Sequence, residues 1–286
     1  MDIVQTLSPS GTPDSTEARR HIDAERASRR VFFGISAVVF AASMAVTIVG
    51  CTSMSSMGGM PMPGGWTMSM TWMRMPGQSW AGAAASFVGM WVVMMKAMML
   101  PSFTPILWRY RQAVMVDAVA CGRERRVGGL LMIVGTGYFF IWLLYGIGIF
   151  VLGVMVAALE MRMPMLARSV PLLSAAVVVV AGLLQFTPWK ARHLACCRHA
   201  PGSGRSIRAD AATAWKHGVR LAMHCSACTA GLTAVLLVMG VMDLRAMTVV
   251  SFAMTVERLA PNGRRVARMV GVVLLGVGLS MGVHAR

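Results

Sequence analysis

Long runs of apolar residues, separated by short polar segments, dominate this chain. A bilayer-spanning helix needs roughly 20 apolar residues. The pattern therefore predicts spans at 31–51, 80–100, 128–157, 170–187, 218–241, 246–258 and 266–283. The segment 246–258 is short, so six spans with one re-entrant segment remain an alternative. The sequence thus predicts an all-α fold, a polytopic transmembrane helical bundle of about seven spans.

The first 30 residues differ in composition from the rest. They are polar, contain Pro9 and Pro13, and end in an arginine-rich run. Such a segment cannot bury much apolar surface. We expect a disordered cytoplasmic tail over residues 1–30 and a single transmembrane domain over residues 31–284, with a methionine-rich outer loop at 52–79.

The net charge of +16 sorts to one side of the predicted bilayer. With the N-terminus inside, the basic residues outside the cytoplasmic segments are Arg74, Arg162, Arg168, Arg245 and Arg286, with Lys96 inside a span. The positive-inside rule then predicts a membrane protein whose N-terminus is cytoplasmic and whose C-terminus lies on the outer side of the bilayer. The lipid bilayer accounts for the basic charge without nucleic acid, and the oligomeric state stays open.

Methionine is unusually frequent, with 28 residues in the chain. The predicted outer loop holds many of them among Gly, Ser, Thr and Pro, a context without an apolar core. A thioether is a soft, uncharged ligand that suits Cu(I). Interfacial hydrophobic residues in a methionine-biased sequence are the alternative. The loop's candidate copper ligands are Met57, Met60, Met62, Met68 and Met70.

The second predicted span also carries a methionine face. Its methionines follow helical spacing towards Pro101, where we expect the helix to end. Met94, Met98 and Met99 are candidate ligands, although packing of a flexible core residue explains such a stripe equally well. Lys96 either reaches the interface or pairs with Glu257.

Cys225 and Cys228 lie three residues apart in the fifth predicted span, so their sulfur atoms share one helix face. This spacing fits a metal site or a quinone-coupled dithiol. Two observations favour metal: the predicted outer side has no second cysteine pair to pass oxidising equivalents, and the ionisable Glu257 lies at the same predicted depth. His224 is a further candidate ligand at this depth, although polar groups at helix ends explain His224 and Glu257 as well.

Another candidate pair lies in the predicted cytoplasmic loop after the fourth span. If residues 188–199 are helical, His193 and Cys197 form an i, i+4 pair that can share an ion. A basic interfacial loop with incidental thiols is the alternative there.

Three motifs together resemble the predicted metal-binding integral membrane proteins of the domain of unknown function 2182. The first is Ala97-Met98-Met99-Leu100-Pro101-Ser102 after Trp91 and Met94. The second is a loop with Pro188, Lys190, Cys197 and Arg198. The third comprises Cys225, Cys228, Gly240, Met242, Met247 and Glu257.

The resemblance, to a bacterial family, covers roughly residues 31–284 and implies metal handling in the bacterial inner (cytoplasmic) membrane, with the C-terminus periplasmic. The best-described member of that family is regarded as a copper-delivery partner of a tyrosinase. This chain departs from the family pattern in having His193 where the loop usually has its first Cys, Thr229 after Cys228, and Lys96 where a small residue is usual. These departures argue against a three-thiolate site and for a mixed Met/Cys/His site.

We therefore expect a Cu(I)-binding inner-membrane protein that acts in copper delivery, transfer or tolerance, possesses no catalytic residue, and has a copper-dependent enzyme as a partner. One alternative is an enzyme, either a membrane thiol oxidoreductase or a copper oxygenase-type subunit that uses Cys225 and Cys228. The other is a non-catalytic membrane assembly subunit whose methionines pack.

Overall fold

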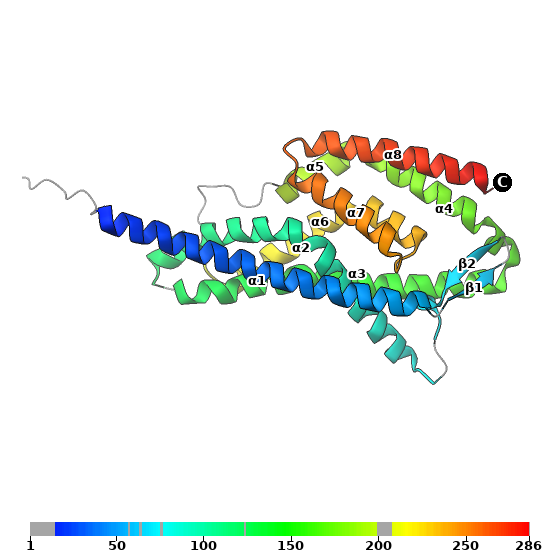
Figure 1. Cartoon of the computed structure of the whole chain (residues 1–286), viewed down its shortest axis with the longest axis horizontal. Coiled ribbons are helices and arrows are strands. Elements are labelled where there is room, and N and C mark those ends of the chain that lie inside the picture. Colours follow the sequence, from blue (N-terminus) through cyan, green and yellow to red (C-terminus); the bar gives the residue numbers. More distant parts are fainter. Residues whose placement is uncertain are drawn as a thin grey trace, which may run out of the picture. The chain divides into compact units, whose positions relative to one another are not determined.

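A computed structural model of the chain describes residues 15–56, 58–62, 65–74, 77–122, 124–198 and 208–285. Apart from one short hairpin, the described part is helical (Figure 1), which confirms the all-α prediction. Residues 1–39 and 40–286 form separate compact units. The helices are α1 Ser15–Ser56, α2 Trp80–Ala120, α3 Val127–Arg162, α4 Pro164–Leu184, α5 Pro188–Arg198, α6 Ala211–Met239, α7 Leu244–Leu259 and α8 Gly263–His284. Two 3-10 turns are η1 Met70–Trp72 and η2 Glu124–Arg126.

The first unit consists, where it is described, of the N-terminal part of α1. Residues 15–30, predicted as disordered, are helical, so that prediction is wrong for this stretch. Extending an existing helix adds about one hydrogen bond per residue fixed, which makes propagation from an apolar span easy. Asp23 and Arg26 form an exposed i, i+3 pair at 4.0 Å within this stretch. Residues 1–14 lie outside the described part.

Six helices of the described part are long and apolar enough to cross a membrane. They are Asp23–Met54, Trp80–Ala120, Glu124–Arg162, Pro164–Leu184, Ala211–Met239 and Gly263–His284. The predicted span 246–258 corresponds to α7, which has only 16 residues. At about 1.5 Å per residue it is about 24 Å long, less than the roughly 30 Å of a hydrocarbon core. Six helices of the described part therefore have the length of a span, and α7, the predicted span 246–258, falls short of it.

Although α7 is short, it runs between two distinct levels of the second unit. Near its start, the Met247 sulfur lies 3.8 Å from the Cys51 sulfur at the end of α1. Near its end, Arg258 donates to the Ser102 hydroxyl of α2 at 2.9 Å. We call these levels the hairpin end and the α5 end, after the elements found there (Figure 1). Helix α7 thus connects the two ends within the bundle.

Helix α2 continues through Pro101 and Pro105, so the predicted end at Pro101 is wrong. Each proline removes one backbone donor, at a cost of about 3 kcal/mol. Burial on both sides of the prolines offsets this cost, since Met98 and Met99 are buried before them and Tyr110 and Val114 after them. The helix therefore extends well past its predicted membrane span.

The predicted outer loop contains an antiparallel hairpin of β1 (Gly59–Met62) and β2 (Trp66–Ser69). Met60 stands opposite Met68, and Met62 opposite Trp66. Because directly opposed residues share a face of the sheet, these methionines project from one side. The Trp66 indole donates to the Ala167 carbonyl at 2.9 Å, which fixes the hairpin to the start of α4.

Candidate metal centre

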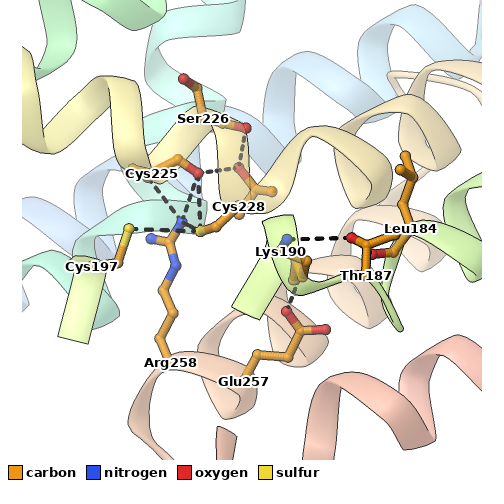
Figure 2. Close-up of polar contacts among 10 residues, drawn as sticks. Leu184, Thr187, Lys190, Cys197, Cys225, Ser226, Cys228, Glu257 and Arg258 are labelled. Carbon is orange, nitrogen blue, oxygen red and sulfur yellow. Dashed lines mark hydrogen bonds and ion pairs between the residues drawn. The ribbon is translucent and has the colours of Figure 1, made fainter. Parts of the chain in front are cut away.

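Sulfur atoms from three helices gather at the α5 end of the bundle. The Cys197 and Cys228 sulfurs are 3.7 Å apart, and the Cys225 and Met99 sulfurs are 3.9 Å apart. All four side chains are at most 2% exposed. We call Met99, Cys197, Cys225 and Cys228 the α5-end cluster. Figure 2 shows its three cysteines from α5 and α6 facing one another.

The cluster depends on the register between α5 and α6. His193 and Cys197 lie one turn apart on α5, as predicted for a helical segment. They face His224 and Cys228, which have the same spacing on α6: the two histidine Nδ1 atoms are 3.2 Å apart, and the two thiols 3.7 Å. Helices α5 and α6 therefore contact each other at two positions one turn apart, a histidine pair and a cysteine pair. The hydrogen bond with Cys228, together with burial, raises the pKa of the Cys197 thiol above its ordinary value.

Helix α6 begins at a well-defined cap, which fixes where its cysteines fall. The Asp210 carboxylate accepts a hydrogen bond from the Thr213 amide at 2.9 Å. Such a cap satisfies one of the unpaired amides at the helix start. The same hydrogen bond lowers the pKa of the Asp210 carboxyl.

A guanidinium group lies among these sulfur atoms. Arg258 of α7 donates to the Cys225 sulfur at 2.9 Å, to the Met99 sulfur at 3.4 Å and to the Cys228 sulfur at 3.6 Å. Figure 2 shows this group reaching towards the cysteines of both neighbouring helices. Arg258 is 8% exposed, and no Asp or Glu of the described residues forms an ion pair with it. A buried cation without a carboxylate partner requires another anion nearby, and thiolates are the available ones.

Two further polar contacts surround the cluster. The Tyr138 hydroxyl lies 2.7 Å from the Cys225 sulfur. Lys190 and Glu257 form a buried ion pair at 2.8 Å that joins α5 to α7 (Figure 2). The suggested pairing of Lys96 with Glu257 is therefore wrong, because Lys190 occupies that position and the Lys96 ammonium lies 5.7 Å from the Phe139 ring centroid.

The other predicted ligands lie apart from these sulfur contacts. Met94 and Met98 are buried in the apolar core, at 0% and 3% exposure. Met60, Met62 and Met68 belong to the hairpin. Met57 lies outside the described residues, as does the side chain of Met70.

Sequence reasoning missed Arg258 and Tyr138. Arg258 was counted among the basic residues of a cytoplasmic turn, although it directly follows the candidate Glu257. A charged residue at the edge of an apolar segment is a functional candidate in its own right, and this signal was present. Tyr138 gave no signal, since an aromatic residue in an apolar span is ordinary.

Across the described residues, no group of three or more His, Cys, Asp and Glu side chains stands ready to hold a metal ion. The sulfur contacts are instead pairwise, with Arg258 bonded across the two pairs. A shared ion would require the pairs to close together and the guanidinium to move aside. The chemistry of the donors, three thiols and a thioether, fits a soft ion such as Cu(I).

Comparison with known families gives one match. The family model described as PpoB2, copper chaperone, matches residues 88–281, which is more than half of the chain. The matched region includes every residue of the α5-end cluster. No curated protein and no solved structure matches the chain.

Proposed function

The chain belongs to the PpoB2 copper chaperone family, and from this membership we propose that it binds Cu(I) in a bacterial inner membrane and delivers it to a copper-dependent enzyme. The α5-end cluster is the binding site: two of its three cysteines, Cys197, Cys225 and Cys228, bind as thiolates and the third stays a thiol. Met99 supplies the thioether. The observation that carries the proposal is the convergence of four buried sulfur atoms from α2, α5 and α6.

The charge of the site supports a monovalent ion. Before binding, Arg258 is balanced by one thiolate. A Cu(I) ion held by two thiolates leaves a net charge of −1, which Arg258 neutralises. The balance is that one Cu(I) enters and one thiol proton leaves to solvent, so we expect one proton released per ion. Metal binding to thiols releases protons in general.

The methionines of α2 provide a route into this site. One face of α2 carries methionines at four-residue spacing, Met90, Met94 and Met98, and leads towards Met99. Weak, neutral thioethers can pass a soft ion along without trapping it. We assign Met94 and Met98 to transfer and the cysteines to retention.

A cavity of about 480 Å³ lies beside the cluster and gives a partner access to it. Its lining includes Cys197, Arg258, Arg109 and Arg264. The thiol of Cys197 is therefore the ligand nearest to an incoming protein. A basic rim favours a partner with an acidic surface, because complementary charge speeds association.

In this proposal the six long apolar helices span the membrane, and α7, which runs from the hairpin end to the α5 end, carries the chain back between α6 and α8. The N-terminus is cytoplasmic, as the positive-inside rule predicts. The hairpin with Met60, Met62 and Met68 then faces the periplasm and captures copper there, and the C-terminus is on the same side.

Cu(I) titration of the purified full-length protein under anaerobic conditions, in competition with a chromophoric Cu(I) chelator, tests the proposal. We expect wild type to hold Cu(I) against the chelator and Cys225→Ala/Cys228→Ala to lose one equivalent. The matched control is Cys121→Ala, because Cys121 is exposed. Equal binding by the double variant and wild type would sink the proposal.

One observation favours a second candidate, a thiol oxidoreductase. The Cys197 and Cys228 sulfur atoms lie 3.7 Å apart, so a small movement would join them in a disulfide, with two electrons and the two thiol protons passing to a quinone-type acceptor. The redox pair would then be Cys197–Cys228 instead of the predicted Cys225–Cys228. Oxidation followed by mass mapping of disulfides distinguishes the two functions, since a copper carrier keeps both thiols reduced during turnover.

A further inference from the structure

A second group of sulfur atoms lies at the hairpin end of the bundle. The Cys51 sulfur of α1 is 3.9 Å from the Met242 sulfur and 3.8 Å from the Met247 sulfur. Cys51 is 0% exposed and Met247 is 5% exposed. Three sulfur atoms from two distant parts of the sequence thus meet at one place, where Cys51 and Met247 are buried and Met242 is half-buried.

The turn between α6 and α7 holds the two methionines in position. Gly240 has φ +112°, a conformation that favours glycine, and it reverses the chain after α6. Asp243 then caps α7 by accepting hydrogen bonds from the Arg245 and Ala246 amides, at 2.7 and 3.1 Å. Because Met242 precedes this cap and Met247 follows it within about one turn, both sulfur atoms are directed to the same thiol.

An independent feature connects this group to a space that an ion could enter. A cavity of about 330 Å³ is lined by Met242 together with Met54, Met73 and Met90. Gly50, directly before Cys51, leaves room for the Met90 side chain, since an added Cβ would lie 2.5 Å from its terminal methyl carbon. Three further thioethers therefore line the cavity that reaches the sulfur group.

We propose that Cys51, Met242 and Met247 form a second Cu(I) site, which receives the ion from the methionine-lined cavity. The inference rests on the proposed function, since it takes Cu(I) as the cargo. One thiolate and two neutral thioethers around Cu(I) make an uncharged complex, and the Cys51 proton leaves to solvent. This site needs no counter-cation, unlike the α5-end cluster.

The site lies on the way to that cluster. From Met247 to Arg258 the α7 axis rises about 16 Å, with Met254 buried between them. Met90 of the cavity begins the α2 methionine face that leads to Met99. The Cys51 site therefore stands at the start of the proposed route.

The experiment is a count of bound Cu(I) on the full-length protein in detergent with four variants. We expect Cys51→Ala/Met247→Leu to bind one equivalent fewer than wild type and to keep the equivalent that Cys225→Ala/Cys228→Ala loses. Combining all four substitutions should remove both equivalents. Met132→Leu, at a methionine that is 72% exposed, is the matched control.

Each outcome bears on a separate idea. If Cys51→Ala/Met247→Leu binds as much Cu(I) as wild type, these sulfur atoms only pack and the second site is refuted, while the proposed function stands. If no variant and not even wild type binds Cu(I), the proposed function itself fails. Met242→Leu/Met247→Leu conserves volume and keeps Cys51. This variant should also lose one equivalent of Cu(I). It provides the test if Cys51→Ala/Met247→Leu does not fold.

Discussion

The two sulfur groups of this protein differ in their chemistry. The α5-end cluster has three thiols, one thioether and a buried guanidinium. The Cys51 site has one thiol, two thioethers and a methionine-lined cavity beside it. Thiolates bind Cu(I) more strongly than neutral thioethers, because they carry charge. Under the proposed function, we therefore expect the α5-end cluster to retain the ion and the Cys51 site to exchange it.

Position within the fold matches this difference. The α5-end cluster is closed by a short helix that contacts α6 through two side-chain pairs and α7 through an ion pair. The Cys51 site is instead formed by the end of one helix and the start of another. We therefore expect release from the α5-end cluster to require movement of α5, whereas the Cys51 site would exchange its ion through the methionine-lined cavity beside it.

The largest expected effect comes from breaking the ion pair that holds α5. Glu257→Gln leaves the Lys190 ammonium buried without a partner, which costs about 3–5 kcal/mol. Thermal unfolding in detergent should show this loss, and Cu(I) binding should decline at the α5-end cluster only. The double variant Lys190→Met/Glu257→Leu should recover most of the stability. If Glu257→Gln weakens both sites equally, the two ends are not independent.

Two adjacent cysteines of α5 give the next test. Cys197→Ala removes a buried ligand of the cluster, so Cu(I) affinity should fall at least about 100-fold, which corresponds to about 2.7 kcal/mol. Cys196→Ala removes an exposed thiol one residue away and should leave the affinity unchanged. Chelator competition measures both. Equal behaviour of the two variants would show that retention does not depend on the α5 contact.

Arg258 tests whether charge distinguishes the α5-end cluster from the Cys51 site. Arg258→Met removes the cation that neutralises a bis-thiolate Cu(I) complex, and we expect about 10–100-fold weaker binding, the usual range for groups just outside a metal's ligands. Arg258→Lys keeps the charge and should retain more of the affinity. Binding at the Cys51 site should not change. Tighter binding by Arg258→Met would mean that the guanidinium competes with copper instead of balancing it.

The transfer residues should affect rate more than equilibrium. Met94→Leu/Met98→Leu conserves core volume at a cost below about 1.5 kcal/mol per site, so the protein should fold and bind the same number of Cu(I) ions. The α5-end cluster should load with Cu(I) more slowly, and stopped-flow mixing of the protein with Cu(I) measures this rate. Met132→Leu serves again as the control. Unchanged loading would assign these methionines to packing alone.

Much of this arrangement could be predicted from local sequence. Apolar runs located the long helices, and the i, i+3 and i, i+4 spacings placed Cys225 with Cys228 and His193 with Cys197. What the sequence could not show was which helices meet. Contacts between Cys51 and Met247, or between Arg258 and Cys225, join residues far apart in the chain, and no periodicity encodes them.

Proline led to the opposite kind of error. Pro101 predicts a helix end from local geometry, yet tertiary packing of α2 on both sides keeps the helix continuous. The Lys96–Glu257 suggestion failed for a related reason. Only the fold reveals that Lys190 of α5 reaches the carboxylate first.

The smallest effect is expected at the histidine pair. His193 and His224 contact each other one helical turn before the thiols, and we propose that they align α5 with α6 while sulfur binds the ion. His193→Ala should therefore lower Cu(I) affinity by less than about 1.4 kcal/mol, or tenfold. X-ray absorption should show the same sulfur-only ligand shell as in wild type. A nitrogen ligand that disappears in His193→Ala would instead support the mixed Met/Cys/His site that the sequence predicts, and the contrast between a thiol-rich and a thioether-rich site would have to include imidazole.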